Sequence, residues 1–139
     1  MKYSASMHNV NSELDVLLKK GDQTNMLKIP VSPSGFGSSV SGGELLFLAI
    51  AACYCNDIYR EAKNSGIQVD SVEVNVDGDF MAAGQPATNV GYKIKVTAQA
   101  SEEEIRKLIA HTDAMAEIPL SLRNGTTVSL LESVAVSSQ

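Results

Sequence analysis

The clearest hydrophobic pattern in the chain is an unbroken apolar run from Leu45 to Cys55. Ser41 and Glu44 precede the run with the spacing of a capping box, in which each side chain accepts a hydrogen bond from the other residue's backbone N–H. Charged residues appear only after Asn56, and Gly66 can supply a left-handed C-terminal cap. The pattern predicts a helix over residues 41–66. Its first half is apolar on every side, so we expect it to be buried on every side.

Segments with alternating apolar and polar residues predict strands on both sides of this helix. Before the helix, we expect strands at 2–9, 13–18 and 26–31, with a turn at 20–22 that makes 13–31 a β-hairpin. The Gly- and Ser-rich segment 32–43 is predicted to be a loop. After the helix, we expect antiparallel strands at 69–80 and 90–98.

A second helix is predicted after the capping box of Ser101 and Glu104. Its apolar residues share one face, and Ile118-Pro119 is expected to end it. A last strand is predicted over 126–136. Strands, a central buried helix, further strands and an amphipathic helix predict one α+β domain over 1–139, with the helices on an antiparallel sheet.

Composition, charge and the length of the apolar run limit the kinds of partner that the chain can have. The chain is 44% hydrophobic but only 5% aromatic, and a lean aliphatic core of this size often gains stability from a second subunit. The net charge of -5 and the absence of a basic cluster exclude a nucleic-acid partner. The apolar run is too short to span a bilayer, which takes about 20 residues, so no membrane partner is expected.

The two cysteines, Cys53 and Cys55, are separated by a rotation of about 200° around a helix. A disulfide between them would require the helix to unwind, so we expect both to be reduced and the protein to be cytoplasmic. The first residues contain no apolar signal core. His8 and His111 are isolated in the sequence, and they form no zinc site with two helical cysteines. We expect no metal and no cofactor.

Three segments carry a resemblance to a known family. The run GGELLFLAIAAC, the following strand VDSVEVNV and the later SEEEIRKLIAHTDAMAEIPLS resemble the OsmC/Ohr family, named for osmotically inducible protein C and organic hydroperoxide resistance proteins. The resemblance covers the order of elements from Gly21 to the C-terminus. It implies an OsmC-like α+β fold in an intertwined homodimer. Because the best understood members of the family are thiol peroxidases, it also implies a thiol-dependent peroxidase activity.

In those peroxidases a cysteine on the central helix attacks the peroxide, and by position this cysteine corresponds to Cys53. The chain departs from the family pattern elsewhere. Ile118 occupies the position of the resolving cysteine, and no arginine precedes Arg60 to match the family's N-terminal arginine. Gly43 stands where hydroperoxide-resistance members have glutamate, whereas Glu44 matches a more general subgroup.

Each candidate residue has a structural and a functional interpretation. Cys53 is either a reactive thiol or a small buried residue. Arg60, two turns later, can lean back toward it and lower the thiol pKa, while Asp57 opposes this effect or simply pairs with Arg60. Cys55 is assigned to the core face; as a functional alternative, it would replace the lost resolving thiol. Glu44 either caps the helix or handles protons near Cys53.

A lysine at the 19–20 turn is a possible replacement for the missing arginine. The favoured function is an OsmC-like stress-response protein, a thiol peroxidase that acts on a small hydrophobic hydroperoxide. Cys53 is its nucleophile, with Glu44 and Arg60 as assisting residues. Because Ile118 is not a thiol, an external thiol reductant must complete the cycle. The alternative is a non-catalytic dimeric protein that binds an apolar small molecule.

Overall fold

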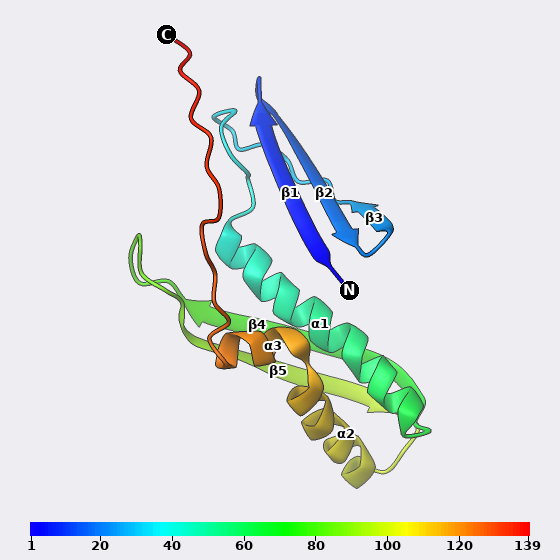
Figure 1. Ribbon diagram of the computed structural model, residues 1–139. Helices are drawn as coiled ribbons and strands as arrows, with labels where there is room; N and C mark the ends of the chain where they lie inside the picture. The colour runs from blue at the N-terminus through cyan, green and yellow to red at the C-terminus, as the bar shows by residue number, and fades with distance from the viewer. The chain divides into compact units, whose positions relative to one another are not determined.

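The computed structural model describes residues 1–139 and contains five strands and three helices (Figure 1). The chain forms two compact units, residues 1–48 with 79–88 and residues 49–78 with 89–139. The elements are β1 (Tyr3–Val10), β2 (Glu13–Lys20), β3 (Gln23–Met26), α1 (Gly42–Asn64), β4 (Val69–Asp79), β5 (Thr88–Ala98), α2 (Glu102–Met115) and α3 (Glu117–Arg123). Helix α1 contributes to both units. The α+β class is confirmed, whereas the intertwined dimer stays a prediction.

The first unit contains a three-stranded antiparallel sheet in the order β1-β2-β3. The predicted strands at 2–9 and 13–18 are confirmed as β1 and β2. The predicted strand at 26–31 is wrong, because β3 ends at Met26. Gly21 adopts a φ of +57°, so the turn is tight and pairing resumes at Gln23, opposite Lys20. Only one further bridge, between Val31 and Ser38, follows.

The loop over 32–43 is confirmed, and one side chain of β1 holds it. The Asn9 amide donates to the Glu13 carbonyl at 2.8 Å and to the Gly35 carbonyl at 3.4 Å. Its Oδ1 accepts from the Gly37 N–H at 2.8 Å. A single asparagine therefore provides hydrogen-bond partners for two backbone groups of the loop, which satisfies them without regular secondary structure.

The capping box that starts α1 is confirmed. The Ser41 N–H donates to Glu44 Oε2 at 2.7 Å, and the Glu44 N–H donates to Ser41 Oγ at 3.2 Å. The helix ends at Asn64, and Gly66 has the positive φ of +69° that its C-terminal cap requires.

The first turn of α1 contacts an aromatic residue that follows β4. The ring of Phe80 stacks on that of Phe47, with centroids 5.8 Å apart. Phe80 also lies against Gly43, where an added Cβ would come within 2.7 Å of its ring carbon Cε2. Gly43 therefore allows the close approach of the ring to the helix.

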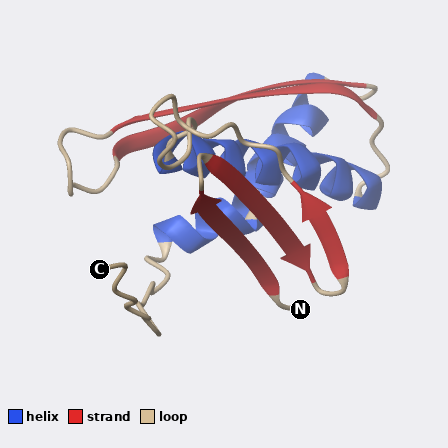
Figure 2. Cartoon of the chain, turned by 90° about the horizontal axis from the view of Figure 1, so that it is seen from above, coloured by secondary structure: helices blue, strands red, loops and turns tan.

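The second unit places one face of the antiparallel β4–β5 pair against its helices. Figure 2 shows these helical segments on one side of the two strands. The core of this unit consists of four buried residues: Tyr54, Ile58, Ala62 and Leu108. Alternate residues of the strands pack against them, namely Val72, Val74, Tyr92, Ile94 and Val96, together with Val69 at the start of β4. The period-two pattern in the sequence therefore reports the buried face correctly.

The predicted capping box of Ser101 and Glu104 is confirmed at the start of α2. The expected end of this helix is different, because α2 ends at Met115 and Ile118-Pro119 lies inside the short helix α3. Pro119 falls in the first turn of α3, where a missing N–H removes no helical hydrogen bond. The break between the two helices lies at Ala116, whose backbone is extended, and the proline belongs to the start of the second helix instead of ending the first.

The predicted strand over 126–136 is wrong, because residues 126–139 form no regular secondary structure. A strand needs a neighbour to accept and donate its backbone hydrogen bonds, and no strand pairs with this segment. Its apolar side chains are exposed: Val128, Leu130, Leu131, Val134 and Val136.

Burial of α1 on every side is also not observed. Ile50, Tyr54, Ile58 and Ala62 are buried, but Leu48 is 58% exposed and Tyr59 is 44% exposed. A stripe of α1 thus remains uncovered within one chain. No helix combines the length and the hydropathy needed to cross a membrane.

Candidate functional site

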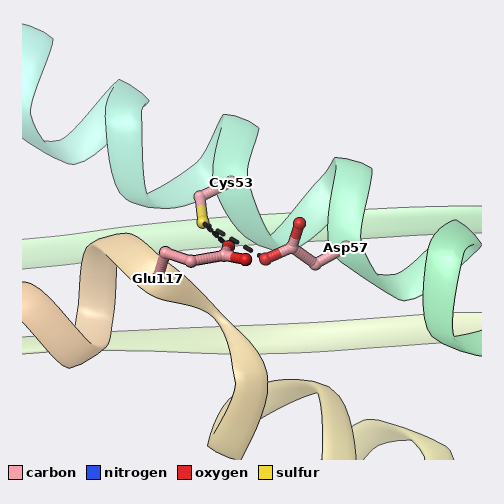
Figure 3. A group of neighbouring side chains, drawn as sticks. All are labelled: Cys53, Asp57 and Glu117. Carbon is pink, nitrogen blue, oxygen red and sulfur yellow. Dashed lines mark hydrogen bonds between the residues drawn. The ribbon is translucent and has the colours of Figure 1, made fainter. Parts of the chain in front are cut away.

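The second unit brings the thiol of Cys53 next to two carboxylates (Figure 3). Asp57 follows one turn later on α1, so its side chain shares the face of Cys53. The thiol donates to Asp57 Oδ2 at 3.4 Å, and Glu117 Oε2 from the start of α3 lies 3.8 Å from the sulfur. The three side chains point toward one another from two helices.

Arg60 binds the other oxygen of each carboxylate. Its Nη1 lies 3.1 Å from Asp57 Oδ1 and 3.2 Å from Glu117 Oε1. Its Nε donates to Glu61 Oε1 at 3.0 Å, and Glu61 Oε2 lies 3.0 Å from His111 Nε2. The arginine therefore leaves Oδ2 and Oε2 directed at the sulfur. A chain of polar groups extends away from the thiol toward His111.

The surroundings raise the pKa of the Cys53 thiol. Burial contributes most, and the negative charges of Asp57 and Glu117 add to it, while a hydrogen bond from the Ile118 backbone opposes it. Burial and the neighbouring Glu117 also raise the pKa of Asp57. Glu117 has a lowered pKa because its own backbone N–H, Asp57 and Arg60 stabilise its charge. Of the two carboxyl groups, Asp57 is therefore the stronger base.

The expected effect of Arg60 on the thiol is wrong. Arg60 pairs with Asp57, as the alternative interpretation held, and with Glu61 and Glu117. The cation is therefore bound to the carboxylates that surround Cys53, and the thiol pKa rises instead of falling. Catalytic roles for Cys53 and Arg60 stay predictions.

The structure does not bring Glu44 to Cys53. The two residues are nine positions apart on one helix, about 13.5 Å along its axis. Hydrogen bonds from the backbone and hydroxyl of Ser41 lower the pKa of Glu44 in its capping role. A proton-handling role for Glu44 stays a prediction.

The core face assigned to Cys55 is only partly buried. Both cysteines are free and half-buried, and the nearby Leu48 and Tyr59 are exposed. The buried stripe of α1 instead follows Tyr54, Ile58 and Ala62. The difference between the two thiols therefore lies in their polar neighbours and not in burial class.

Glu117 is the site residue that sequence reasoning missed. It is 64 positions from Cys53, and no local spacing connects them. The neighbouring residue could have pointed to it, because Ile118 occupies the family position of the resolving cysteine and was therefore expected near Cys53. The Ile118 backbone does form a hydrogen bond with the Cys53 sulfur. The same reasoning applied one residue earlier would have found Glu117.

A separate cavity lies between β5, α2 and α3. It has a volume of about 430 Å³, and its lining includes Tyr54, Ile94, Ile109, Asp113 and Arg123. Arg123 Nη2 lies 2.7 Å from Asp113 Oδ1, and the Tyr92 hydroxyl also donates to that carboxylate. The cavity is thus partly apolar, with one neutralised ion pair on its wall.

Comparison with known proteins connects this geometry to a family. No functionally curated protein matches the sequence. An OsmC-like protein from Mycoplasma pneumoniae superposes with a TM-score of 0.65 at 16% identity, covering 88% of both chains. A putative osmotic stress induced and detoxification response protein from Psychrobacter arcticus gives 0.61 at 17% identity, covering 84% of this chain and 85% of the other.

An organic hydroperoxide resistance protein from Legionella pneumophila gives a TM-score of 0.58 at 18% identity, covering 88% of this chain and 90% of the other. At these identities the likeness concerns the fold. The family model for OsmC-like protein matches residues 35–131, which include α1, both strands of the second sheet and both later helices. The chain therefore belongs to the OsmC-like protein family.

Proposed function

We propose that this protein is a thiol-dependent hydroperoxide reductase with Cys53 as its nucleophile. The main support is the hydrogen bond from the Cys53 thiol to Asp57 Oδ2 at 3.4 Å, because it places a proton acceptor beside a half-buried thiol. Burial raises the pKa of Asp57, which makes it a better base for that proton. Membership of the family and the hydroperoxide resistance proteins of the same fold support the assignment.

The proposed reaction proceeds in two stages. The Cys53 sulfur attacks one peroxide oxygen, the O–O bond breaks, and the thiol proton passes through Asp57 to the departing alcohol. The protein then carries a sulfenic acid. One external thiol displaces water to form a mixed disulfide, and a second releases an external disulfide and restores Cys53.

An external reductant is required because neither nearby residue can resolve the sulfenic acid. Ile118 carries no thiol, and Cys55 points away from Cys53 by a rotation of about 200° around α1. Small thiols also keep protein cysteines reduced, and both cysteines of this chain are free. We therefore propose a cytoplasmic location, where such thiols are abundant. We propose a small hydrophobic hydroperoxide as the substrate class.

A second copy of the chain is proposed as the partner. The stripe of α1 around Leu48 and Tyr59 and the apolar side chains of 126–136 are exposed in one chain. Large apolar side chains exposed in such number are typical of a surface that another protein covers. An intertwined homodimer would cover it.

The second candidate function is non-catalytic binding of an apolar small molecule. The observation that favours it is the cavity of about 430 Å³ at β5, α2 and α3, which falls within the usual size range of ligand pockets. In this case Cys53 would have no role in turnover.

The test is consumption of an organic hydroperoxide by the reduced protein with several thiol reductants. Wild type and Cys55→Ser should consume peroxide, whereas Cys53→Ser should not. Mass analysis after peroxide treatment should place one oxygen atom or one thiol adduct on Cys53. Equal consumption by Cys53→Ser, or a protein that never consumes peroxide above the uncatalysed rate, would reject the enzyme in favour of the binding protein.

A further inference from the structure

The cluster of Cys53, Asp57 and Glu117 has the geometry of a metal centre. Their three ligand atoms lie within 4.8 Å of one another. Tetrahedral zinc, with Zn–S near 2.3 Å and Zn–O near 2.0 Å, places a sulfur and an oxygen about 3.5 Å apart. The observed sulfur–oxygen distances are 3.4 and 3.8 Å. Both sulfur–oxygen distances are therefore close to those of such a tetrahedron, and the two carboxylate oxygens lie within 4.8 Å of each other.

Arg60 holds the two carboxylates from the side opposite the sulfur. It binds Asp57 Oδ1 and Glu117 Oε1, so it orients both carboxylates without occupying the oxygens that face the sulfur. Outer hydrogen bonds of this kind are the usual way in which proteins orient metal ligands. The Asp57 side chain is only 8% exposed and directs Oδ2 into the cluster, so one ligand is held rigidly by burial.

The charge of the cluster also favours a cation. A thiolate and two carboxylates carry three negative charges, of which a divalent ion would neutralise two, while Arg60, which also pairs with Glu61, offsets part of the remainder. One thiolate with two carboxylate oxygens suits zinc, whereas magnesium and calcium prefer oxygen ligands alone. The histidine-based criteria applied to the sequence could not detect the site, since its ligands are one cysteine and one aspartate of α1 and one glutamate of α3.

We propose that Cys53, Asp57 and Glu117 form a site for a divalent zinc-like cation. Binding replaces the thiol proton, which leaves to solvent, and converts Cys53 into a metal-bound thiolate. The site stands on its geometry. Its consequence for activity rests on the proposed function, because a sulfur held by the metal cannot attack a peroxide, so the metal would act as a reversible inhibitor.

The test uses Zn²⁺ in competition with a chromophoric chelator, and Co²⁺ as a spectroscopic probe, on reduced protein freed of metal by a chelator. We expect one Zn²⁺ per chain, release of one proton and a thiolate-to-cobalt charge-transfer band. Cys55→Ser should keep the band and Cys53→Ser should lose it. Glu117→Gln should weaken Zn²⁺ binding at least tenfold, and this variant should fold because Glu117 is exposed.

Zinc binding that is unchanged in Cys53→Ser or in Glu117→Gln would overturn the proposal, as would no binding at all or equal binding of Mg²⁺. Peroxide consumption is measured separately on the metal-free protein. If that protein is inactive but binds zinc through Cys53, the peroxidase proposal fails and the metal site stands. If the metal-free protein is active and zinc neither binds nor inhibits it, the metal site fails and the peroxidase proposal stands.

Discussion

Replacing Glu117 with glutamine should make Cys53 more reactive. The carboxylate lies 3.8 Å from the sulfur, and its negative charge opposes formation of the thiolate. At this distance two unit charges in a water-like dielectric repel by about 1 kcal/mol, which corresponds to about a fivefold change in thiolate fraction. Arg60 and solvent screen the Glu117 charge, so we expect an increase of about two- to fivefold at neutral pH.

The assay is the rate of iodoacetamide alkylation from pH 6 to pH 10, with a chelator present. A Cys55→Ser background ensures that only the Cys53 thiol is counted. Because the thiol pKa is raised, the rate should still be climbing above pH 9 in the parent and should level off earlier in Glu117→Gln.

The matched control is Glu103→Gln, which removes the same charge from α2, where Glu103 pairs with Lys107. This variant should react like the parent. An unchanged or slower rate in Glu117→Gln would show that the charge of Glu117 does not reach the sulfur, and the electrostatic account of the site would be wrong.

Three further predictions concern geometry, ionisation and assembly. Ile118→Cys should form a disulfide with Cys53 after peroxide treatment, seen by non-reducing mass analysis, because α3 already contacts the sulfur; a pair that stays reduced even with a general oxidant would refute this proximity. Burial and the hydrogen bond to Asp113 raise the pKa of Tyr92 from 10.0 to about 12. The stabilisation that comes from this shift is complete below pH 10 and is lost as the pH rises toward 12. Tyr92→Phe should therefore reduce the fall in unfolding free energy between these pH values. An unchanged fall would exclude Tyr92 as its source. Sedimentation at micromolar concentration should show a dimer that Leu48→Glu weakens, whereas a stable wild-type monomer would remove the proposed partner.

Local signals in the sequence were sufficient wherever the structure depends on residues within one or two turns. Both capping boxes are confirmed, since each involves residues only three positions apart. The alternation in β4 and β5 correctly reports their buried faces. The alternation in 126–136 does not produce a strand, because pairing also requires a neighbour, which a single segment's pattern does not specify.

The site was only half predictable for the same reason. Cys53 was found from its helix and the family resemblance, and the Asp57–Arg60 pair from helical spacing. The thiol pKa is raised mainly by burial among elements from distant parts of the chain, and the charges of Asp57 and Glu117 add to it. Glu117 belongs to α3 and also pairs with Arg60. Electrostatics at the thiol are therefore a tertiary property, and spacing along one helix cannot determine them.

The close contact between Phe80 and Gly43 limits how this chain can diverge within its family. Gly43 stands where hydroperoxide-resistance members carry a glutamate. A side chain at this position would meet the Phe80 ring, which is itself stacked on Phe47. A substitution to glutamate would therefore be tolerated only if the ring moved or became smaller first. The two positions are therefore coupled, and in relatives with a glutamate in place of this glycine the residue equivalent to Phe80 should be smaller or should point away from the helix.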